Sequence, residues 1–277
     1  MFSLSGKTVI VTGGGRGVGR GISRSIAEAG ANLVVTGRSP GPLEDAAAEA
    51  RKMGAKALAV PGDITDAAFR QSLVDQTVKT FGSLHGLINN AGSADPADVG
   101  PLISLNEGQF DRVVDLNLKS AFFVAQACAK VMDAQGTGGA IVNISSRSGS
   151  FPCPMTGQYG AAKAGLESLT MTMATEWGHM GIRVNALALG IVRTENSSSH
   201  ANPNRERRNI EITPLRRLGE PQDVGPLCVA FVSDDTSWVT GTVVRVDGGG
   251  RLPVGLLTYF HNISKKMAAK AAGQAAE

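Results

Sequence analysis

Thr12-Gly13-Gly14-Gly15-Arg16-Gly17-Val18-Gly19 is the most informative run of residues in this chain. It follows a short β-branched stretch that reads as a strand, and it opens directly into a helical pattern. Glycines at such a turn let the backbone approach a pyrophosphate, which the free N–H groups and positive dipole of the helix N-terminus stabilise. A strand, turn and helix in this order predict a dinucleotide-binding site rather than an ordinary glycine-rich turn.

Strand-like and helix-like segments alternate along the rest of the chain. Short β-branched or apolar runs predict strands over residues 7–12, 32–36, 55–60, 84–89, 139–145, 183–188 and 242–246. Longer amphipathic runs predict helices over residues 18–29, 43–53, 67–81, 107–134, 158–180 and 221–232. This order predicts an α/β fold: a Rossmann-like, doubly wound, parallel seven-stranded sheet with helices on both faces, in one domain over residues 1–250. Residues 251–277 would form a C-terminal extension.

The periodic pattern stops between Ile191 and Thr213, where polar residues dominate. A long stretch without a core pattern inside a compact domain is usually functional. We therefore expect residues 191–213 to form a lid over a substrate. This region and the segment after it are also the most basic part of the chain, with arginines at positions 205, 207, 208, 216 and 217. A solvated loop explains these charges more simply than a phosphate-binding track.

The composition excludes several classes of protein. The 277 residues are 42% hydrophobic and 18% charged with a net charge of +3, which is typical of neither a disordered chain nor a nucleic-acid-binding protein. No segment has the roughly 18 consecutive apolar residues of a membrane span. The three cysteines are far apart and the four histidines are scattered, so we expect neither a disulfide framework nor a metal site. A cytoplasmic location is expected from the cysteine usage and from the lack of a signal-peptide pattern.

The motifs of the chain resemble those of one family. The Thr-Gly-x-x-x-Gly-x-Gly pattern of residues 12–19 is similar to the dinucleotide fingerprint of the short-chain dehydrogenase/reductase family, in its single-domain branch. The family's further motifs follow in the same order: Gly62-Asp63, Asn89-Asn90-Ala91-Gly92, Asn117, Ser145-Ser146 and Tyr159-x-x-x-Lys163. The resemblance covers residues 4–250. It implies an oxidoreductase that transfers a hydride between a nicotinamide cofactor and a carbonyl or secondary alcohol.

Tyr159 and Lys163 are the centre of the expected chemistry. Their spacing of four places both side chains on one face of a helix. An ammonium beside a phenol favours the phenolate, so we expect Lys163 to lower the pKa of Tyr159 from its usual value of about 10. The resemblance implies that Tyr159 is the general acid and base, and that Ser146 hydrogen-bonds the substrate oxygen. It also implies that Lys163 holds the nicotinamide ribose and that Asn117 holds a water linking Lys163 to solvent.

The resemblance implies a set of cofactor contacts as well. The expected residues are Gly13, Gly15, Arg16, Gly17, Val18, Gly19, Arg38, Asp63, Ile64, Asn90, Ala91, Gly92, Tyr159, Lys163, Gly190, Val192 and Thr194. Asp63 and Ile64 would meet the adenine ring, and residues 190–194 would contact the nicotinamide carboxamide. Asn90 would tie the central strands together beside the adenosine ribose. Leu189 stands where the family usually has proline, which leaves the loop after it less stiff.

The cofactor is expected to be NADP(H). An NAD-preferring site places a carboxylate about 20 residues after the glycine motif, at the end of the second strand. Gly37 occupies that position in this chain. Arg38 comes next and Arg16 lies in the glycine loop, so two guanidinium groups can converge on a 2′-phosphate and donate bidentate hydrogen bonds to it.

The substrate is less sharply defined. Ser148, Phe151, Pro152 and Met155 are expected to line its pocket, and the three apolar side chains indicate a partly hydrophobic small molecule. The alternative enzyme is a 3-oxoacyl-thioester reductase, because an acidic acyl carrier protein would suit the basic residues of the lid. An alternative from another class is a non-catalytic NADP-binding sensor on the same fold, which would not need the complete set of catalytic residues.

The resemblance finally implies a homo-oligomer, most simply a homotetramer. The two longest predicted helices carry more apolar residues than one face of a sheet should need. The side chains expected to face outward are Phe122, Phe123, Leu166, Leu169 and Met173.

Overall fold

The seven predicted strands form one parallel sheet. The computed structural model describes residues 2–195 and 203–250, together with Asn262 and Lys265. Its strands are β1 (Thr8–Thr12), β2 (Asn32–Gly37), β3 (Ala57–Pro61), β4 (Gly86–Asn89), β5 (Gly139–Ser146), β6 (Ile182–Leu189) and β7 (Val243–Val246). They lie in the order β3-β2-β1-β4-β5-β6-β7, and every neighbouring pair is parallel. The predicted doubly wound sheet is confirmed.

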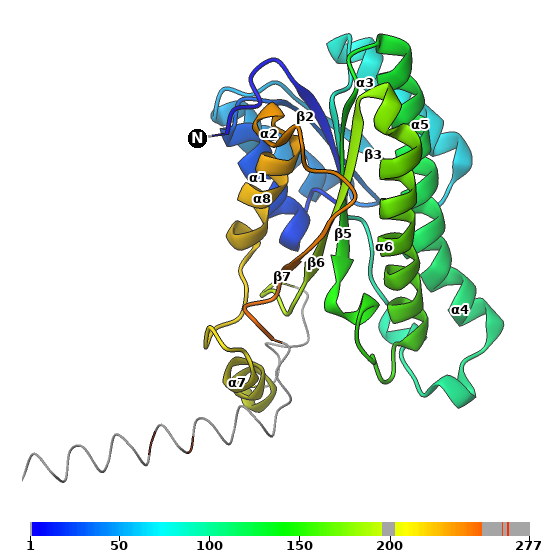
Figure 1. Ribbon diagram of the computed structural model, residues 1–277, viewed down its shortest axis with the longest axis vertical. Helices are drawn as coiled ribbons and strands as arrows, with labels where there is room; N and C mark the ends of the chain where they lie inside the picture. Colours follow the sequence, from blue (N-terminus) through cyan, green and yellow to red (C-terminus); the bar gives the residue numbers. More distant parts are fainter. Residues whose placement is uncertain (1, 196–202, 251–261, 263–264, 266–277) are drawn as a thin grey trace, which may run out of the picture.

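Helices cover both faces of this sheet (Figure 1). One face packs against α1 (Gly17–Glu28), α2 (Pro40–Lys52) and α8 (Pro221–Val232). The other packs against α3 (Ala67–Phe81), α5 (Ser120–Gln135) and α6 (Gly157–Trp177), and α4 (Glu107–Val114) precedes α5. A further helix, α7 (Pro203–Ile212), lies at the end of the molecule toward which β5 and β6 run (Figure 1). Within the described residues, no helix is long and apolar enough to cross a membrane.

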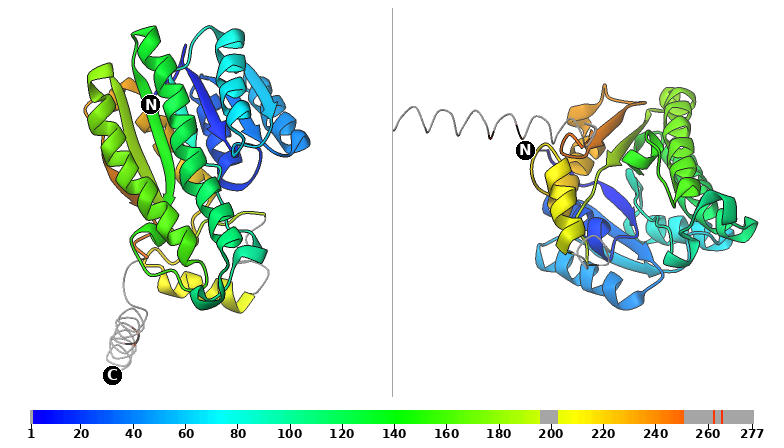
Figure 2. Two further views of the ribbon diagram at one scale, coloured as in Figure 1. Left: turned by 90° about the vertical axis from the view of Figure 1, so that its right-hand side faces the viewer. Right: turned by 90° about the horizontal axis from the view of Figure 1, so that it is seen from below.

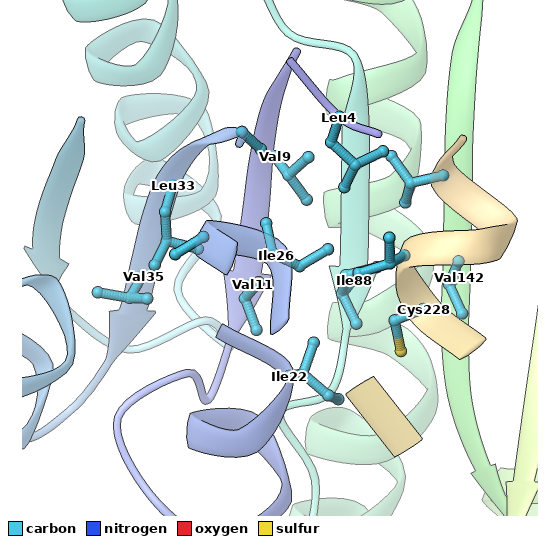
Figure 3. Close-up of a cluster of buried hydrophobic side chains, with 14 of the residues drawn as sticks. Leu4, Val9, Val11, Ile22, Ile26, Leu33, Val35, Ile88, Val142 and Cys228 are labelled. Atoms are coloured by element: carbon cyan, nitrogen blue, oxygen red, sulfur yellow. The ribbon is translucent and has the colours of Figure 1, made fainter. Parts of the chain in front are cut away.

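The two halves of the core arise because side chains alternate along each strand. In β1, Val9 and Val11 pack on the side of α1 and α8, whereas Ile10 packs on the side of α3 and α5. Figure 3 shows the first of these clusters, in which Ile22 and Ile26 of α1 meet the strands. Burial on both faces explains why the strands read as nearly continuous apolar runs.

The order of the strands creates a crevice. From β1 the chain first adds β2 and β3 on one side, and it then crosses over to add β4 to β7 on the other. Such a reversal leaves a crevice at the carboxyl ends of the two central strands. Thr12 ends β1 and Asn89 ends β4, so the glycine loop and the Asn89-Asn90-Ala91-Gly92 run meet at this point.

The helix predicted over residues 107–134 is interrupted in the structure. α4 ends at Val114, a π-helical turn spans Asp115–Lys119, and α5 begins at Ser120. The interruption carries Asn117, whose side chain is fully buried. Turns of this kind are frequent at functional sites. The apolar spacing continues through the turn, which is why the sequence reads as one helix.

Part of the predicted lid over residues 191–213 is a helix, which the sequence pattern did not indicate; the role of this segment as a lid stays a prediction. Residues 203–212 form α7. This helix buries only Asn209 and is stabilised on its surface by an i,i+4 pair, Arg207 Nε to Glu211 Oε1 at 3.1 Å. A helix that is polar nearly all round has no apolar period to detect. Lid residues 196–202 lie outside the described residues, as does the C-terminal extension apart from Asn262 and Lys265.

The prediction of outward apolar side chains needs a similar correction. Leu166 and Met173 are only 1% and 2% exposed, because the side of α6 that carries them faces the sheet. Phe122 and Leu169 are half-buried against the same core. Of the five predicted residues, Phe123 alone is well exposed.

Candidate active site

The glycine loop joins β1 to α1 in a tight turn. Gly13 has a positive φ of 65° and donates its N–H to the Thr36 carbonyl at 2.7 Å. A Cβ on Gly19 would lie 2.0 Å from the Gly13 carbonyl oxygen, so no side chain fits where α1 passes the loop. The helix has Arg16 as its N-cap without a side-chain cap bond, and its first turn carries no acidic residue. Its N–H groups and positive dipole therefore suit an anion such as a pyrophosphate.

Two adjoining cavities run along the carboxyl ends of the strands. The first, of about 450 Å³, is lined by Gly13, Arg16, Gly17, Val18, Gly19, Asn90, Ala91, Gly92, Ser146, Tyr159, Lys163, Gly190, Val192 and Thr194, among others. The second, of about 740 Å³, includes Arg38, Asp63 and Ile64 in its lining. The two cavities share Gly13, Ala91, Gly92 and Ser93, so they form one groove. The structure thus brings all but one of the predicted cofactor residues to a single groove.

Two of the predicted residues shape the groove through the backbone. Gly15 is the one that lines neither cavity: a Cβ there would lie 3.0 Å from the backbone of Pro42, so Gly15 faces α2. Asn90 donates from Nδ2 to the Thr12 carbonyl at 2.9 Å and from its N–H to Thr12 Oγ1 at 3.0 Å. Asn90 therefore holds the end of β4 against the end of β1.

Ser146, Tyr159 and Lys163 come together on one wall of the first cavity. Ser146 ends β5, while Tyr159 and Lys163 lie one turn apart near the start of α6. The Lys163 ammonium lies 5.6 Å from the centroid of the Tyr159 ring, and it donates to the Ile144 carbonyl at 2.9 Å. A hydrogen bond also links the side chains of Tyr159 and Ser146. The spacing of four residues therefore has the expected geometric consequence.

The electrostatics differ from the expectation. Burial raises the pKa of the Tyr159 phenol above its usual value, and the hydrogen bond with Ser146 only partly opposes this. The predicted lowering by Lys163 is wrong for this structure, because the desolvation of the phenolate is the largest effect. Burial also lowers the pKa of Lys163 to about 8, and the nearby Glu167 carboxylate opposes that shift. The ammonium is itself hard to keep charged at this position.

Asn117 is brought to the same point by the π-helical turn. Its Nδ2 donates to the Ser93 carbonyl at 2.7 Å and to the Val113 carbonyl at 2.9 Å. Its Oδ1 is buried and has no hydrogen-bond partner in the described part of the chain. A Cβ placed on Gly92 would lie 2.5 Å from this oxygen and 3.1 Å from Lys163 Nζ. The two side chains therefore converge on the same small space beside Gly92.

Sequence reasoning missed several side chains that hold this wall in place. Asn89 donates to Asn143 Oδ1 at 2.9 Å, and Asn143 donates to Thr170 Oγ1 at 2.9 Å, which links β4, β5 and α6. Glu167, one turn after Lys163, accepts a hydrogen bond from Ser145 Oγ at 2.7 Å. These pairs join elements far apart in the sequence, so no local spacing indicates them.

The predicted substrate residues lie on the segment between β5 and α6. None of Ser148, Phe151, Pro152 and Met155 lines either cavity. Phe151 and Met155 are 38% and 47% exposed, and Met155 has an unusual positive φ of 72°. Ser148 accepts a hydrogen bond from Cys153 Sγ at 3.2 Å. Their role in binding a substrate stays a prediction.

No group of three or more His, Cys, Asp or Glu side chains is arranged to hold a metal ion among the residues that the structure describes. His85 instead accepts a hydrogen bond at Nδ1 from the Thr8 N–H at 3.0 Å, at the opposite end of β1 from the glycine loop. His200 and His261 lie outside the described residues. Cys128, Cys153 and Cys228 are all free thiols.

Comparison with known proteins identifies the family. Residues 13–250 match the family model described as enoyl-(acyl carrier protein) reductase. An L-rhamnose 1-dehydrogenase (NAD(P)(+)) from Sphingomonas sp. (strain SKA58) is 36% identical over 248 residues, which is 89% of this chain and 96% of that protein. The chain is a short-chain dehydrogenase/reductase.

Other members of the short-chain dehydrogenase/reductase family agree in sequence and in fold. A 7alpha-hydroxysteroid dehydrogenase from Escherichia coli (strain K12) is 33% identical, covering 89% of this chain and 95% of that protein. The crystal structure of a short-chain type dehydrogenase/reductase from Mycobacterium marinum superposes with a TM-score of 0.85 at 31% identity, over 91% of this chain and 98% of that one. This chain is thus an oxidoreductase of a family that acts on alcohols and carbonyls with nicotinamide cofactors.

Proposed function

We propose that this short-chain dehydrogenase/reductase is an NADP(H)-dependent enzyme that interconverts a carbonyl and a secondary alcohol, with Tyr159 as the general acid and base. The observation that carries the proposal is the shared cavity. Ser146, Tyr159 and Lys163 line the same space as the glycine loop, whose helix N-terminus suits a pyrophosphate. A proton donor and a dinucleotide site therefore open on one cavity.

The residues of the chain would supply the proton and the orientation, and the bound cofactor would supply the hydride. In reduction, Tyr159 gives its hydroxyl proton to the substrate oxygen as the carbonyl becomes an alcohol, and in oxidation it takes this proton back. The pKa of Tyr159 is raised by burial, so the phenol is protonated at neutral pH and is ready to act as an acid. Ser146 hydrogen-bonds Tyr159 in the free protein, and with a substrate bound its single hydroxyl proton would turn to the substrate oxygen and give that oxygen a second hydrogen bond.

Lys163 and Asn117 would return the proton from solvent. Because Lys163 Nζ and Asn117 Oδ1 converge beside Gly92, a water bonded to both would give the unpartnered Oδ1 a hydrogen bond. With a pKa of about 8, Lys163 exchanges its proton close to neutral pH. This arrangement supports the role that the resemblance implies for Asn117.

Three features support NADP(H) over NAD(H). Gly37, at the end of β2, places no carboxylate beside the second cavity. Arg38 lines this cavity, and Arg16 lines the adjoining one at the N-cap of α1. The hydrogen bond from the Thr65 N–H lowers the pKa of the Asp63 carboxyl, and the nearby Arg38 guanidinium lowers it to a smaller extent, so Asp63 partly offsets the positive charge of Arg38. Two arginines without a competing carboxylate on β2 favour a 2′-phosphate.

For the substrate we propose a partly hydrophobic carbonyl compound. The exposed Phe151 and Met155, on the segment between Ser146 and Tyr159, support an apolar molecule. A screen should compare cyclic and steroid ketones, a 3-oxoacyl thioester and an aldose, each with both cofactors and in both directions.

Tyr159→Phe tests the mechanism most directly. The ring stays and only the transferable proton is lost, so the rate on the best substrate should fall by about 10²- to 10⁴-fold. The affinity for NADPH, followed by its fluorescence, should stay close to the wild-type value. If the variant kept more than about a tenth of the wild-type rate, Tyr159 would not be the acid.

A further inference from the structure

Glu167 is a carboxylate placed next to the proposed catalytic residues without an ion-pair partner. It lies on α6 one turn beyond Lys163 and is half-buried. No Lys, Arg or His within the described residues lies within 4 Å of it. A partly desolvated charge is costly unless hydrogen bonds or a function compensate for it.

Two serines that flank Ser146 donate hydrogen bonds to this carboxylate. Ser145 Oγ donates to Oε1 at 2.7 Å, and Ser150 Oγ donates to Oε2 at 3.3 Å. Between these serines the chain makes a single 3₁₀ turn, Arg147–Gly149, and Ser146 Oγ accepts the Ser148 N–H at 3.2 Å as its N-cap. Glu167 therefore holds both ends of the short segment that carries the Ser146 hydroxyl.

Gly149 shows how closely the turn is held to α6. A Cβ on Gly149 would lie 2.8 Å from Glu167 Oε1 and 3.1 Å from the Ala164 backbone nitrogen. Both distances are shorter than ordinary contacts, so a side chain at position 149 would push the carboxylate away from the turn.

The same carboxylate also acts electrostatically on Lys163, which lies one turn before it on α6. The other groups around this ammonium are the Tyr159 ring on α6, the Ile144 carbonyl on β5 and the Asn117 side chain on the π-helical turn. Of these groups only Tyr159 titrates, and it carries no charge at neutral pH. Glu167 is thus the negative charge that favours the protonated form of Lys163.

We propose that Glu167 is a positioning residue for the reaction: it clamps the turn that carries Ser146, and it places a negative charge one turn from Lys163 on the same helix. The inference rests on the proposed function, because it gives Ser146 and Lys163 their roles. It adds a residue that acts through both of them without touching the substrate.

The clamp is tested in the cofactor-free protein by hydrogen exchange. Glu167→Ala should raise the exchange rate of peptides spanning residues 146–150 about thirtyfold, since two hydrogen bonds of about 1 kcal/mol each are lost and about 1.4 kcal/mol corresponds to a factor of ten. Glu167→Gln keeps the length of the side chain and its capacity to bond both serines, so exchange should stay near wild type. Glu176→Gln, a change at an exposed glutamate on the same helix, is the matched control. Wild-type exchange in Glu167→Ala would overturn the clamp.

The charge is tested by titrating the ¹³Cε resonance of Lys163, assigned by its absence in Lys163→Met. Glu167→Gln should lower the midpoint from about 8 by about one pH unit, because the carboxylate no longer favours the ammonium. Glu176→Gln should leave the midpoint unchanged. An unchanged midpoint in Glu167→Gln would refute the electrostatic part of the proposal.

Turnover links the two parts to the reaction. Glu167→Ala should lower kcat about tenfold or more with little change in cofactor affinity. A misplaced Ser146 hydroxyl reduces the stabilisation of the transition state more than it reduces the binding of the cofactor. In Glu167→Gln the loss should grow as pH rises from 6.5 to 8. If wild type itself shows no turnover while exchange and titration respond as expected, the proposed function fails but the clamp does not. If all three readouts match wild type, the inference about Glu167 fails alone.

Discussion

At the scale of single residues, Arg38 tests the cofactor preference. It lines the second cavity of the groove, and Gly37 at the end of β2 brings no carboxylate to that cavity. Charge-assisted hydrogen bonds contribute roughly 1.5 to 3 kcal/mol, so Arg38→Ala should weaken NADPH binding about ten- to a hundredfold. NADH binding should hardly change, because NADH has no 2′-phosphate, and titration with each cofactor separates the two effects.

A second substitution at the same strand end should reverse the preference. A Cβ on Gly37 would meet nothing closer than Leu43 Cδ2 at 3.7 Å, so Gly37→Asp fits without a clash. Its carboxylate would repel a 2′-phosphate and accept hydrogen bonds from a ribose diol. The double variant should therefore prefer NADH. Equal or better kcat/KM with NADH than with NADPH in wild type would contradict the preference from the start.

Lys163 carries a cost in stability that follows from its burial. Its pKa in the folded protein is about 8, against an ordinary value of 10.5. Below pH 8 the folded and unfolded states are both protonated, and the buried charge destabilises the fold by about 3 kcal/mol at about 1.4 kcal/mol per pKa unit. As the pH rises from 8 to 10.5 the folded state loses its proton first, so this cost disappears over that range.

Lys163→Met should therefore stabilise the protein at pH 7 while abolishing turnover. Methionine is apolar and of similar length, and the lost hydrogen bond to the Ile144 carbonyl costs only about 1 kcal/mol. The expected net gain in the free energy of unfolding is about 1 to 2 kcal/mol, measured by urea denaturation at pH 7. The gain should shrink when the comparison is repeated at pH 10, and a variant less stable than wild type at pH 7 would refute the argument.

The positions of the site residues could be predicted from the sequence, whereas their pKa values could not. The spacing of Tyr159 and Lys163 correctly places both on one wall. The pKa of Tyr159 depends instead on how much solvent the surrounding elements remove, and this cannot be derived from a spacing of four. The sequence did not indicate Glu167 for the same reason, because its hydrogen-bond partners Ser145 and Ser150 lie outside α6.

At the scale of elements, the glycine loop and α1 depend on each other. A Cβ on Gly19 would overlap the Gly13 carbonyl oxygen at 2.0 Å, and backbone cannot move away as a flexible side chain can. Gly19→Ala should therefore destabilise the fold by about 2 kcal/mol or more and weaken binding of both cofactors. Gly41→Ala in α2 is the matched control, because nothing lies within 4 Å of its added Cβ. Gly41 lies in the first turn of α2 before Pro42, where alanine gains little as a helix former, so Gly41→Ala should leave the temperature of thermal unfolding close to wild type while Gly19→Ala lowers it.

Helices and strands that bury one side against the core could be predicted from the sequence. The exposed helix α7 and the π-helical turn within the α4–α5 region could not. The strands and the helices that pack on the sheet lie close to their predicted positions, because burial imposes alternation on strands and an apolar stripe on helices. The exposed α7 has no stripe to detect. The π-helical turn at Asn117 keeps the apolar spacing while changing the hydrogen bonds beneath it. Both exceptions lie at the groove end of the molecule, where function constrains the backbone more than the core does.

At the scale of the whole molecule, the described chain leaves apolar side chains exposed along α4, α5 and α6. Phe110 is 44% exposed, Phe123 39% and Met171 50%. The left view of Figure 2 shows α5 and α6 side by side across this face. The apolar surface predicted on these helices therefore exists, but Phe110 and Met171 contribute to it in place of the buried Leu166 and Met173.

We predict that this face joins copies of the chain into a homo-oligomer, most simply a homotetramer. An exposed apolar face across two long helices is typical of an interface, and a charge introduced on it would have to be desolvated on association. Phe123→Asp should therefore shift sedimentation at micromolar concentration toward the 28.6 kDa monomer. Met53→Asp changes a side chain of similar exposure next to α2, remote from this face, and should leave the wild-type distribution unchanged. Wild-type protein that sediments only as a monomer would show that the face serves some other contact.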